Sequence, residues 1–505
     1  MAATLNRQRA SGSGAQGGGG GYVIENSLRF NELDSAQLNY TNSSAPTDAS
    51  KGIVGCWIKR TDISHATNQT IIAGGSAESV VVHFNAGNQL LWREDGLAGA
   101  ITTQLFRDPT AWFHLLYSYD SDEGTAANRL QLFINGVEVT AWATAPQNIG
   151  SAEAWGITTN GQEITWGDGP NANTDLGSYL AQAFIIDGLS IQNGDYAVSD
   201  FIDTDSNGNV IPVDLEGAGI TWGNNGSLLD FAIAPGTGNG AGEDVSGNDN
   251  HFSESGLAAN DRVSDSPTDD VELLVGNYAT LSPIGPFITT GTHGVAAITN
   301  GNLYFDNNAS SYLYASSAFI IPKSGKWAFQ VTFRGPVING SQNDQGAGLY
   351  TRKTTGMSNA ATEGNIIVGW QGDVFKNGSA VDNGTALAVD DVVEFLIDVD
   401  ADTIKYLVNS SLRYTSTSVG LGNGEDWFPG GYGYQNELEF DFGQTGYEPS
   451  DSAYLTLNTA NLPEPAVKDS SSHVQTELYV GNATNDKAIS QSGNSTFQPD
   501  HVVVK

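Results

Sequence analysis

The sequence has little cysteine and no long apolar run. Cys56 is the only cysteine among 505 residues, so no disulfide can form within the chain. It lies in the apolar run at residues 53–58, where we expect a small buried core residue rather than a reactive thiol. No apolar run approaches the about 20 residues of a transmembrane helix, and residues 1–21 contain no signal-peptide core. We therefore expect synthesis in a reducing cytoplasm, no membrane insertion, and release by another route such as lysis.

Basic residues are also scarce. The chain has 21 Lys and Arg against 57 Asp and Glu, which gives a formal net charge of −36. A surface of this sign repels phosphate backbones, so we expect no nucleic-acid binding. The many carboxylates favour divalent cations as partners.

Glycine and aromatic residues, by contrast, are abundant. The chain has 61 Gly with 10 Trp, 18 Tyr and 20 Phe, which supply both turns and apolar area for a packed core. Short apolar segments are separated by Gly, Asn and Asp turns, and Asn135-Gly136 is a strong two-residue hairpin signal. We predict an all-β protein of tandem antiparallel jelly-roll (concanavalin A-like) sandwiches, because 505 residues exceed what one core accommodates.

Composition divides the chain into five parts. These are a flexible Gly-rich N-terminal arm (1–21), a first sandwich (22–235), a loop-rich linker (236–272), a second sandwich (273–452) and a small C-terminal β segment (453–505). The last part has strands expected near 476–480 and 501–504. It is too short for a core of its own and should pack on something else.

The arm is opposite in charge to the rest of the chain. It contains Arg7 and Arg9, has almost no apolar residues and ends in five glycines. Such a segment cannot repay its ordering entropy alone. Two readings remain open: a disordered tail, or an anchor that orders on another protein of the same particle.

Residues 23–235 resemble laminin-G-like domains, which have a concanavalin A-like fold. WFHLLYSYD at residues 112–120 is similar to that family's Trp-x-His strand ending in Tyr-Asp. LFINGVE at 132–138 is similar to its Asn-Gly hairpin, and WIKR at 57–60 resembles the strand that precedes both. The resemblance implies a sandwich with His114 packed in a strand, and it leaves the ligand open.

The second sandwich resembles SPRY domains. KWAFQV at 326–331 is similar to that family's Lys-Trp strand, and VEFLIDVD at 393–400 is similar to its hydrophobic-Asp pair. FDFGQ at 440–444 resembles its Asn-Phe-Gly-Gln strand. NSS at 409–411 departs from the Asn-Gly that this family favours at that turn.

The order of several short motifs resembles large fibre or adhesion proteins of marine bacteriophages. The motifs are LAQAFIIDG at 180–188, NGNVIP at 207–212, DVSGNDNHF at 244–252, NYATL at 277–281 and FQPDHV at 497–502. The resemblance implies a virion protein with lectin-like modules.

From this resemblance we expect a tail fibre or receptor-binding protein that attaches the virion to its host. Its partners would be a host-surface glycan, other virion proteins contacted through residues 1–21, and further copies of itself. One alternative is a capsid decoration or head fibre protein. A further alternative is a glycan depolymerase.

One loop has the spacing of a calcium site. Asp203, Asp205, Asn207 and Asp214 place side-chain oxygens at loop positions 1, 3, 5 and 12, and Gly208 stands at position 6. Position 12 is Asp rather than the longer Glu, and no helices are expected on either side. Calcium is the one cofactor that the sequence suggests; the alternative is an Asn-Gly turn between strands.

Four tryptophans lie beside Gly, Asp or Asn turns, where indole rings can stack on sugars. They are Trp92, Trp166, Trp222 and Trp370. The alternative for each is packing in a core.

No catalytic motif is recognisable, so we predict that the chain is not an enzyme. Glu437, Glu439 and Asp441 alternate along one strand with apolar residues between them, which is typical of a strand with one solvated acidic face. Glycosidases need two carboxylates about 5–9 Å apart across a sugar site. The E-x-D-x-x-E motif of concanavalin-like glucanases is absent.

Overall fold

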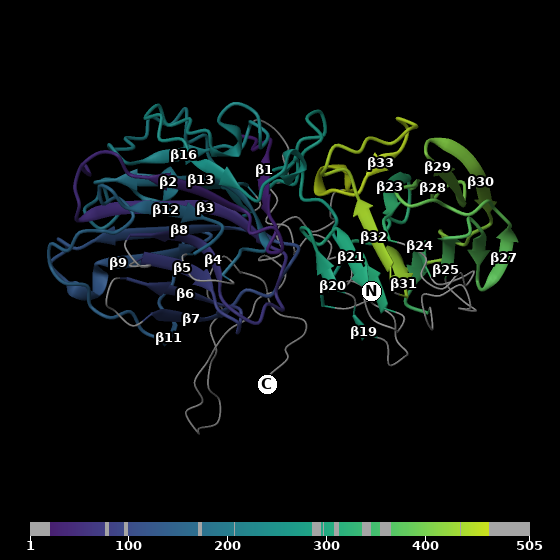
Figure 1. Ribbon diagram of the computed structural model, residues 1–505, viewed down its shortest axis with the longest axis horizontal. Coiled ribbons are helices and arrows are strands. Elements are labelled where there is room, and N and C mark those ends of the chain that lie inside the picture. The colour runs from purple at the N-terminus through teal and green to yellow at the C-terminus, as the bar shows by residue number, and fades with distance from the viewer. Residues whose placement is uncertain are drawn as a thin grey trace, which may run out of the picture.

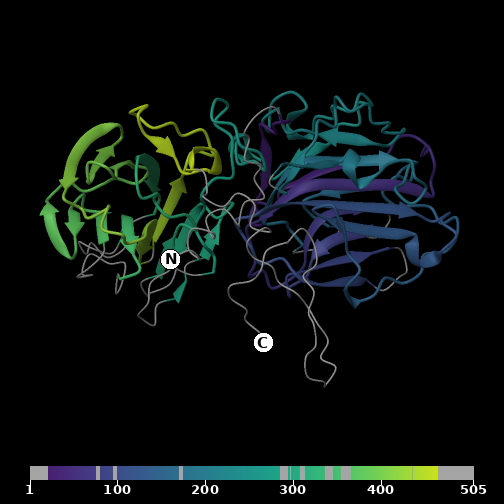
Figure 2. The same cartoon turned by 180° about the vertical axis from the view of Figure 1, so that it is seen from behind.

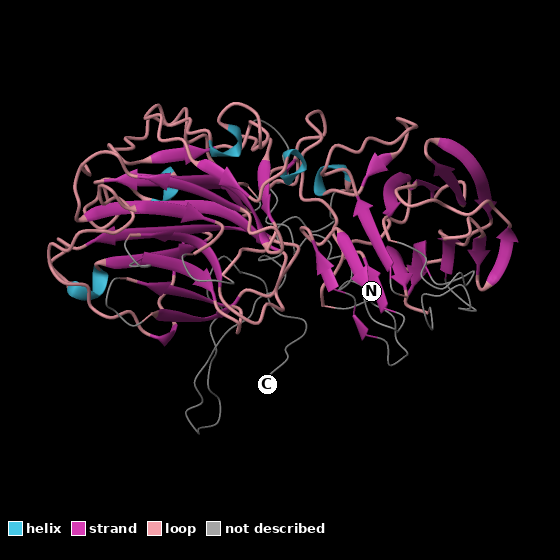
Figure 3. Cartoon of the chain, in the orientation of Figure 1, coloured by secondary structure: helices cyan, strands magenta, loops and turns pink. Residues whose placement is uncertain are grey.

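A computed structural model describes most of the chain between residues 21 and 463. The described ranges are 21–75, 80–94, 99–169, 174–206, 208–284, 294–295, 297–307, 313–335, 345–353, 365–434 and 436–463. Within them the regular structure is β-strands with five short 3₁₀ turns, and no α-helix occurs (Figure 3). The strands are antiparallel except for the pairs β19 (Gly294–Val295) with β22 (Leu313–Ser316) and β23 (Lys326–Phe333) with β33 (Leu455–Thr456). The all-β fold class is confirmed. None of the described helical segments is long or apolar enough to span a membrane.

The chain forms two sandwiches that lie side by side (Figures 1 and 2). The first is built from β1 (Ser27–Phe30), β2 (Gln37–Thr41), β3 (Lys51–Arg60), β4 (Gln69–Gly74), β5 (Val80–Phe84), β6 (Gln89–Arg93), β7 (Ala100–Leu105), β8 (Trp112–Asp120), β9 (Leu130–Ile134), β10 (Val137–Glu138), β11 (Trp142–Thr144), β12 (Glu163–Trp166), β13 (Ser178–Asp187), β14 (Ile202–Thr204), β15 (Val210–Pro212), β16 (Ser227–Leu229), β17 (Ser253–Ser255) and β18 (Arg262–Val263). Its 3₁₀ turns are η1 (Ala126–Asn128), η2 (Val198–Asp200), η3 (Gly240–Gly242) and η4 (Ala259–Asp261).

Two eight-stranded sheets face each other in this sandwich. One has the order β10-β9-β8-β3-β13-β1-β18, with β16 paired to β13, and the other β11-β7-β6-β5-β4-β12-β2-β17. The core between them contains Val54, Cys56, Ile58, Trp92 and Trp166, among other residues. Asn135-Gly136 forms the β9–β10 hairpin turn, as predicted, with both residues at positive φ.

The first of these sheets is buried on both faces. Residues 189–245 pass over its outer face, where Phe184 of β13 stacks on Phe201 with centroids 5.2 Å apart. This explains why β3 and β13 are almost continuously buried instead of alternating between core and solvent. Gly55 of β3 is required because a Cβ there would lie 2.4 Å from the Phe184 ring.

Residues 236–263 of the predicted linker (236–272) belong to the first sandwich. β17 pairs with β2, and β18 pairs with β1, so this segment supplies an edge strand to each sheet. The linker prediction was wrong because strands of two or three residues leave too little periodicity to detect, and their pairing depends on distant partners.

The second sandwich faces the first across residues 264–282, a segment that gives Tyr278, Ala279 and Leu281 to the second core. Its strands are β19 (Gly294–Val295), β20 (Ala297–Thr299), β21 (Tyr304–Asn307), β22 (Leu313–Ser316), β23 (Lys326–Phe333), β24 (Gln345–Thr351), β25 (Asn365–Gly369), β26 (Val374–Lys376), β27 (Ser379–Asp382), β28 (Val392–Asp398), β29 (Thr403–Val408), β30 (Ser411–Thr417), β31 (Trp427–Gly433), β32 (Asn436–Asp441) and β33 (Leu455–Thr456), followed by η5 (Thr459–Asn461).

Its sheets have the orders β19-β22-β31-β24-β25-β26-β27 and β20-β21-β32-β23-β28-β29-β30, with β33 paired to β23. Aromatic side chains form much of the core, and Phe329 stacks on Phe395 with centroids 4.6 Å apart. Because β33 pairs with β23, residues 453–463 belong to this sandwich rather than to a separate C-terminal segment. Residues 1–20 of the predicted arm and 464–505 of the predicted C-terminal segment lie outside the described residues.

Candidate functional site

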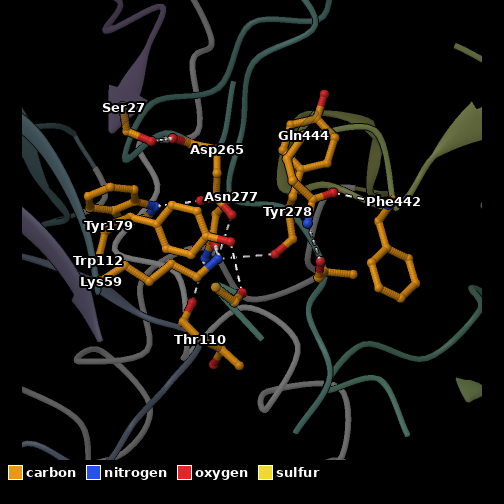
Figure 4. Close-up of polar contacts among 12 residues, drawn as sticks. Ser27, Lys59, Thr110, Trp112, Tyr179, Asp265, Asn277, Tyr278, Phe442 and Gln444 are labelled. Atoms are coloured by element: carbon orange, nitrogen blue, oxygen red, sulfur yellow. Dashed lines mark hydrogen bonds and ion pairs between the residues drawn. The ribbon is translucent and has the colours of Figure 1, made fainter. Parts of the chain in front are cut away.

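A buried polar network centred on Lys59 lies at the junction between the two sandwiches (Figure 4). Lys59 lies near the end of β3, and its Nζ donates to Asp265 Oδ2 and Asn277 Oδ1, each at 2.7 Å, and to the Tyr278 carbonyl at 3.2 Å. The side chains of Lys59 and Asp265 are fully buried. All three ammonium donors therefore have partners, as a buried cation requires.

Asp265 is held from two further directions. Trp112 Nε1 donates to its Oδ1 at 2.9 Å, and Ser27 Oγ donates to its main-chain carbonyl at 2.6 Å. Burial lowers the pKa of Lys59 and raises the pKa of Asp265, while the attraction between the two charges acts in the opposite direction on both. The two groups stay charged and paired only while every hydrogen bond to them is kept.

Asn277 extends the network into the second sandwich. Its Nδ2 donates to the Thr110 carbonyl at 2.7 Å, and its main-chain N donates to Thr459 Oγ1 at 2.8 Å. Gln444 continues the same line, with Nε2 donating to the Ala279 carbonyl at 3.1 Å. Side chains from both sandwiches thus bind the segment that runs between them.

A second set of contacts lies at the turn before β21. Tyr179 of β13 donates from its hydroxyl to the Gly301 carbonyl at 2.8 Å, and Asn302 Nδ2 donates to the Thr61 carbonyl at 3.1 Å. Gly301 has φ +68°, and a Cβ there would lie 2.2 Å from the Tyr179 hydroxyl. Only glycine meets both conditions, so the chain is adapted locally to this close approach.

The geometry of the junction indicates a structural site. A lysine beside a carboxylate could exchange protons with a substrate, but both groups are sealed from solvent, so no substrate reaches them. What the arrangement can do is fix the two sandwiches to each other.

Sequence reasoning missed this site, although two signals were present. One is a lysine inside an apolar strand, since lysine is almost never fully buried unless it is paired. The other is Asp265, which fell in the supposed linker.

Burial contradicts the sugar-stacking prediction for Trp92, Trp166 and Trp222, and for Trp370 it stays a prediction. Trp92 and Trp166 are 2% and 1% exposed in the first core, so neither ring offers a face to a sugar. Trp222 is 8% exposed and packs edge-on against Phe184 outside that core. Trp370 is half-buried against the second core and contacts Phe333. Turn residues next to a tryptophan say nothing about which side of the strand the ring occupies.

The described part of the chain does not bring the three aspartates of the calcium prediction together. Asp205 accepts from both nitrogens of Asn209 in the β14–β15 hairpin, and Asp203 accepts from the Thr204 main-chain N at 2.7 Å. Asp214 caps another turn by accepting from Gly217 N. In the described part of the chain no three His, Cys, Asp or Glu side chains are grouped to hold an ion. Asn207 lies outside that part.

The acidic strand has the predicted alternation. In β32, Leu438 and Phe440 are buried, and the three carboxylates lie on the other face. Each has a partner: Glu437 accepts from the Tyr304 hydroxyl, Glu439 pairs with Arg334, and Asp441 accepts from Gly443 N at 2.8 Å.

Two residues of the first sandwich are placed as expected. His114 is packed in β8, where burial lowers its pKa to about 3, and Cys56 is fully buried, which raises the pKa of its thiol.

No protein-family model and no curated protein matches the chain. Solved structures share parts of the fold at low identity. The SPRY domain of human HERC1 is 12% identical, with 30% of this chain and 94% of that domain covered and a TM-score of 0.26. A heptameric SAP-like pentraxin from Limulus polyphemus is 11% identical, with 34% and 82% covered and a TM-score of 0.26. The PSpry domain of TRIM65 is 9% identical, with 32% and 91% covered and a TM-score of 0.25.

Proposed function

We propose that this chain is a non-enzymatic virion protein of a bacteriophage, a tail fibre or receptor-binding component whose sandwiches meet a host-surface glycan. The observation that carries the proposal is the buried junction around Lys59 and Asp265. Domains of one chain usually move relative to each other unless their interface is well built. A receptor-binding component gains from fixed modules, because surfaces that are already oriented lose less entropy when they bind.

The state of the carboxylates supports a role without catalysis. A glycosidase keeps one carboxyl group protonated and a second one free to act as base or nucleophile. In β32 the three carboxylates are instead held by a tyrosine, an arginine and main-chain amides. The sequence motifs that resemble marine phage fibre proteins support the virion context.

Electron microscopy of phage particles labelled with antibody to this chain tests the location. Label at the tail tip is the expected result, and label over the head would favour the capsid decoration alternative. No label on intact particles would contradict the proposal.

Glycan binding is tested with purified protein and host surface polysaccharide, with polysaccharide from a non-host strain as control. We expect retention on the host polymer without release of shorter products. Shortened chains would identify a depolymerase, and equal behaviour on both polymers would contradict a receptor-binding role.

A further inference from the structure

A tight hairpin within residues 264–282, the junction segment between the two sandwiches, exposes three large aliphatic side chains. At its base, Asp270 and Val275 exchange main-chain hydrogen bonds of 3.0 Å. Asp270 Oδ1 also accepts from the main-chain N of Leu273 at 2.9 Å, which fixes the turn. Val271, Leu273 and Leu274 are 58%, 48% and 44% exposed. We call residues 271–274 the aliphatic tip.

The backbone at Leu274 is unfavourable for the residue it holds. Its φ is +56°, in the left-handed region where a Cβ crowds the backbone and where glycine or asparagine fits better. The Tyr278 hydroxyl donates to the Leu274 carbonyl at 2.5 Å and keeps the turn in place. A leucine that is both strained and exposed is doubly unfavourable in water, so the tip is expected to have a partner.

The chain that continues past Pro463 starts beside this hairpin. Residues 277–279 pair with 457–459: Ala279 N donates to the Leu457 carbonyl at 2.9 Å, and Thr459 N donates to the Asn277 carbonyl at 3.0 Å. Thr459 Oγ1 also donates to Asp269, directly before the hairpin. The described part of the chain, which ends at Pro463, therefore ends close to the base of the tip.

The sequence of this C-terminal segment matches an apolar surface. Leu478-Tyr479-Val480 forms an apolar run, and Val502-Val503-Val504 forms a second one, in a segment too short to bury them in a core of its own. An extended chain spans up to about 3.3 Å per residue, so the first run can reach the tip easily from Pro463.

We propose that residues 464–505 dock on the aliphatic tip, with the run at 478–480 covering Val271, Leu273 and Leu274. The contact would bury apolar surface on both sides. It would also account for a leucine at a position whose backbone suits glycine.

Hydrogen exchange of the full chain tests the docking. In the double variant Leu273→Ser, Leu274→Gly, amides of residues 476–480 are expected to exchange at least tenfold faster than in the wild type. Amides of β3 and β28 should not change. Leu412→Ser is the matched control, because Leu412 is 61% exposed on β30 of the second sandwich, away from the junction segment. It should leave the exchange of 476–480 unaltered.

The Leu274→Gly change also makes the opposite outcome easy to recognise. It relieves the left-handed strain, so without a docked segment the double variant should melt no lower than the wild type and show unchanged exchange at 476–480. That result would overturn the proposal. Sedimentation should give the same mass for both proteins; a wild-type oligomer that the variant loses would instead assign the tip to a second copy.

Discussion

At the scale of single residues, buried ion pairs join distant parts of the sequence, both at the junction and within the first sandwich. Lys59 and Asp265 are 206 positions apart, and Arg29 and Asp261, which form a second buried pair at 2.9 Å, are 232 apart. Removing one member of such a pair leaves the other charge buried without compensation, which costs more than the pair itself contributes.

We therefore expect Asp265→Asn to lower the free energy of unfolding by about 3–5 kcal/mol. The double variant Lys59→Met, Asp265→Asn should lose clearly less than the sum of its two single variants, since neither charge then remains. Urea unfolding measures both. Lys323→Met is the control, because it breaks an exposed ion pair with Asp426 and should cost only about 0–1 kcal/mol. Additive losses in the double variant would contradict the account.

Glu32 carries a carboxyl group whose ionisation lowers the stability of the fold near neutral pH. It follows β1, and burial raises the pKa of its carboxyl to about 7, with smaller contributions from Asp62, Asp34 and Asp175. A raised pKa favours the folded state only below the unfolded value of 4.5. Stability is lost as the pH rises from there to about 7, because the unfolded chain releases its proton first.

Glu32→Gln should therefore stabilise the protein by about 2 kcal/mol at pH 8 and leave it nearly unchanged at pH 4. Thermal unfolding at the two pH values measures the difference. Glu163→Gln, an exposed change on β12, should have the same small effect at both. A larger gain at pH 4 than at pH 8 would reverse the assigned sign.

At the scale of elements, the sequence predicted the kind of each turn and strand better than it predicted which strands pair. Turn chemistry at Asn135-Gly136 and the alternation of β32 are local, and both were predicted correctly. The pairing of β17 and β18 was not, because a strand of two or three residues is stabilised by its neighbour rather than by its own pattern. The Lys59 network could not be derived, since nothing local relates positions 59, 265 and 277.

The edge role of β17 and β18 leads to a truncation test. A fragment of residues 22–235 leaves β1 and β2 without these neighbours, whereas a fragment of 22–263 retains both strands. Neither contains Asp265, and the shorter fragment also loses Asp261, the buried partner of Arg29, together with Phe252 of the core. We expect the shorter fragment to melt lower and to aggregate more, since unpaired edges associate. Equal melting and solubility would mean that residues 236–263 are dispensable.

At the scale of the whole molecule, the two sandwiches should unfold together. The junction links them through buried side chains, so opening one exposes polar groups of the other. Calorimetry of the wild type should show one transition, and Asp265→Asn should separate it into two. Two transitions already in the wild type would mean that the junction does not couple the sandwiches.

The position of β1 also affects how the chain folds as it is made. β1 pairs with β13 and β18, through Leu28 opposite Leu180 and Arg262. At synthesis rates of about 5–20 residues per second, this N-terminal strand waits tens of seconds for its last neighbour. During that time the apolar strands β3 and β8 have left the ribosome without the segment that later covers their outer face. The nascent chain should therefore depend on chaperones until residue 263 has emerged, and rapid expression should favour aggregates of the first sandwich.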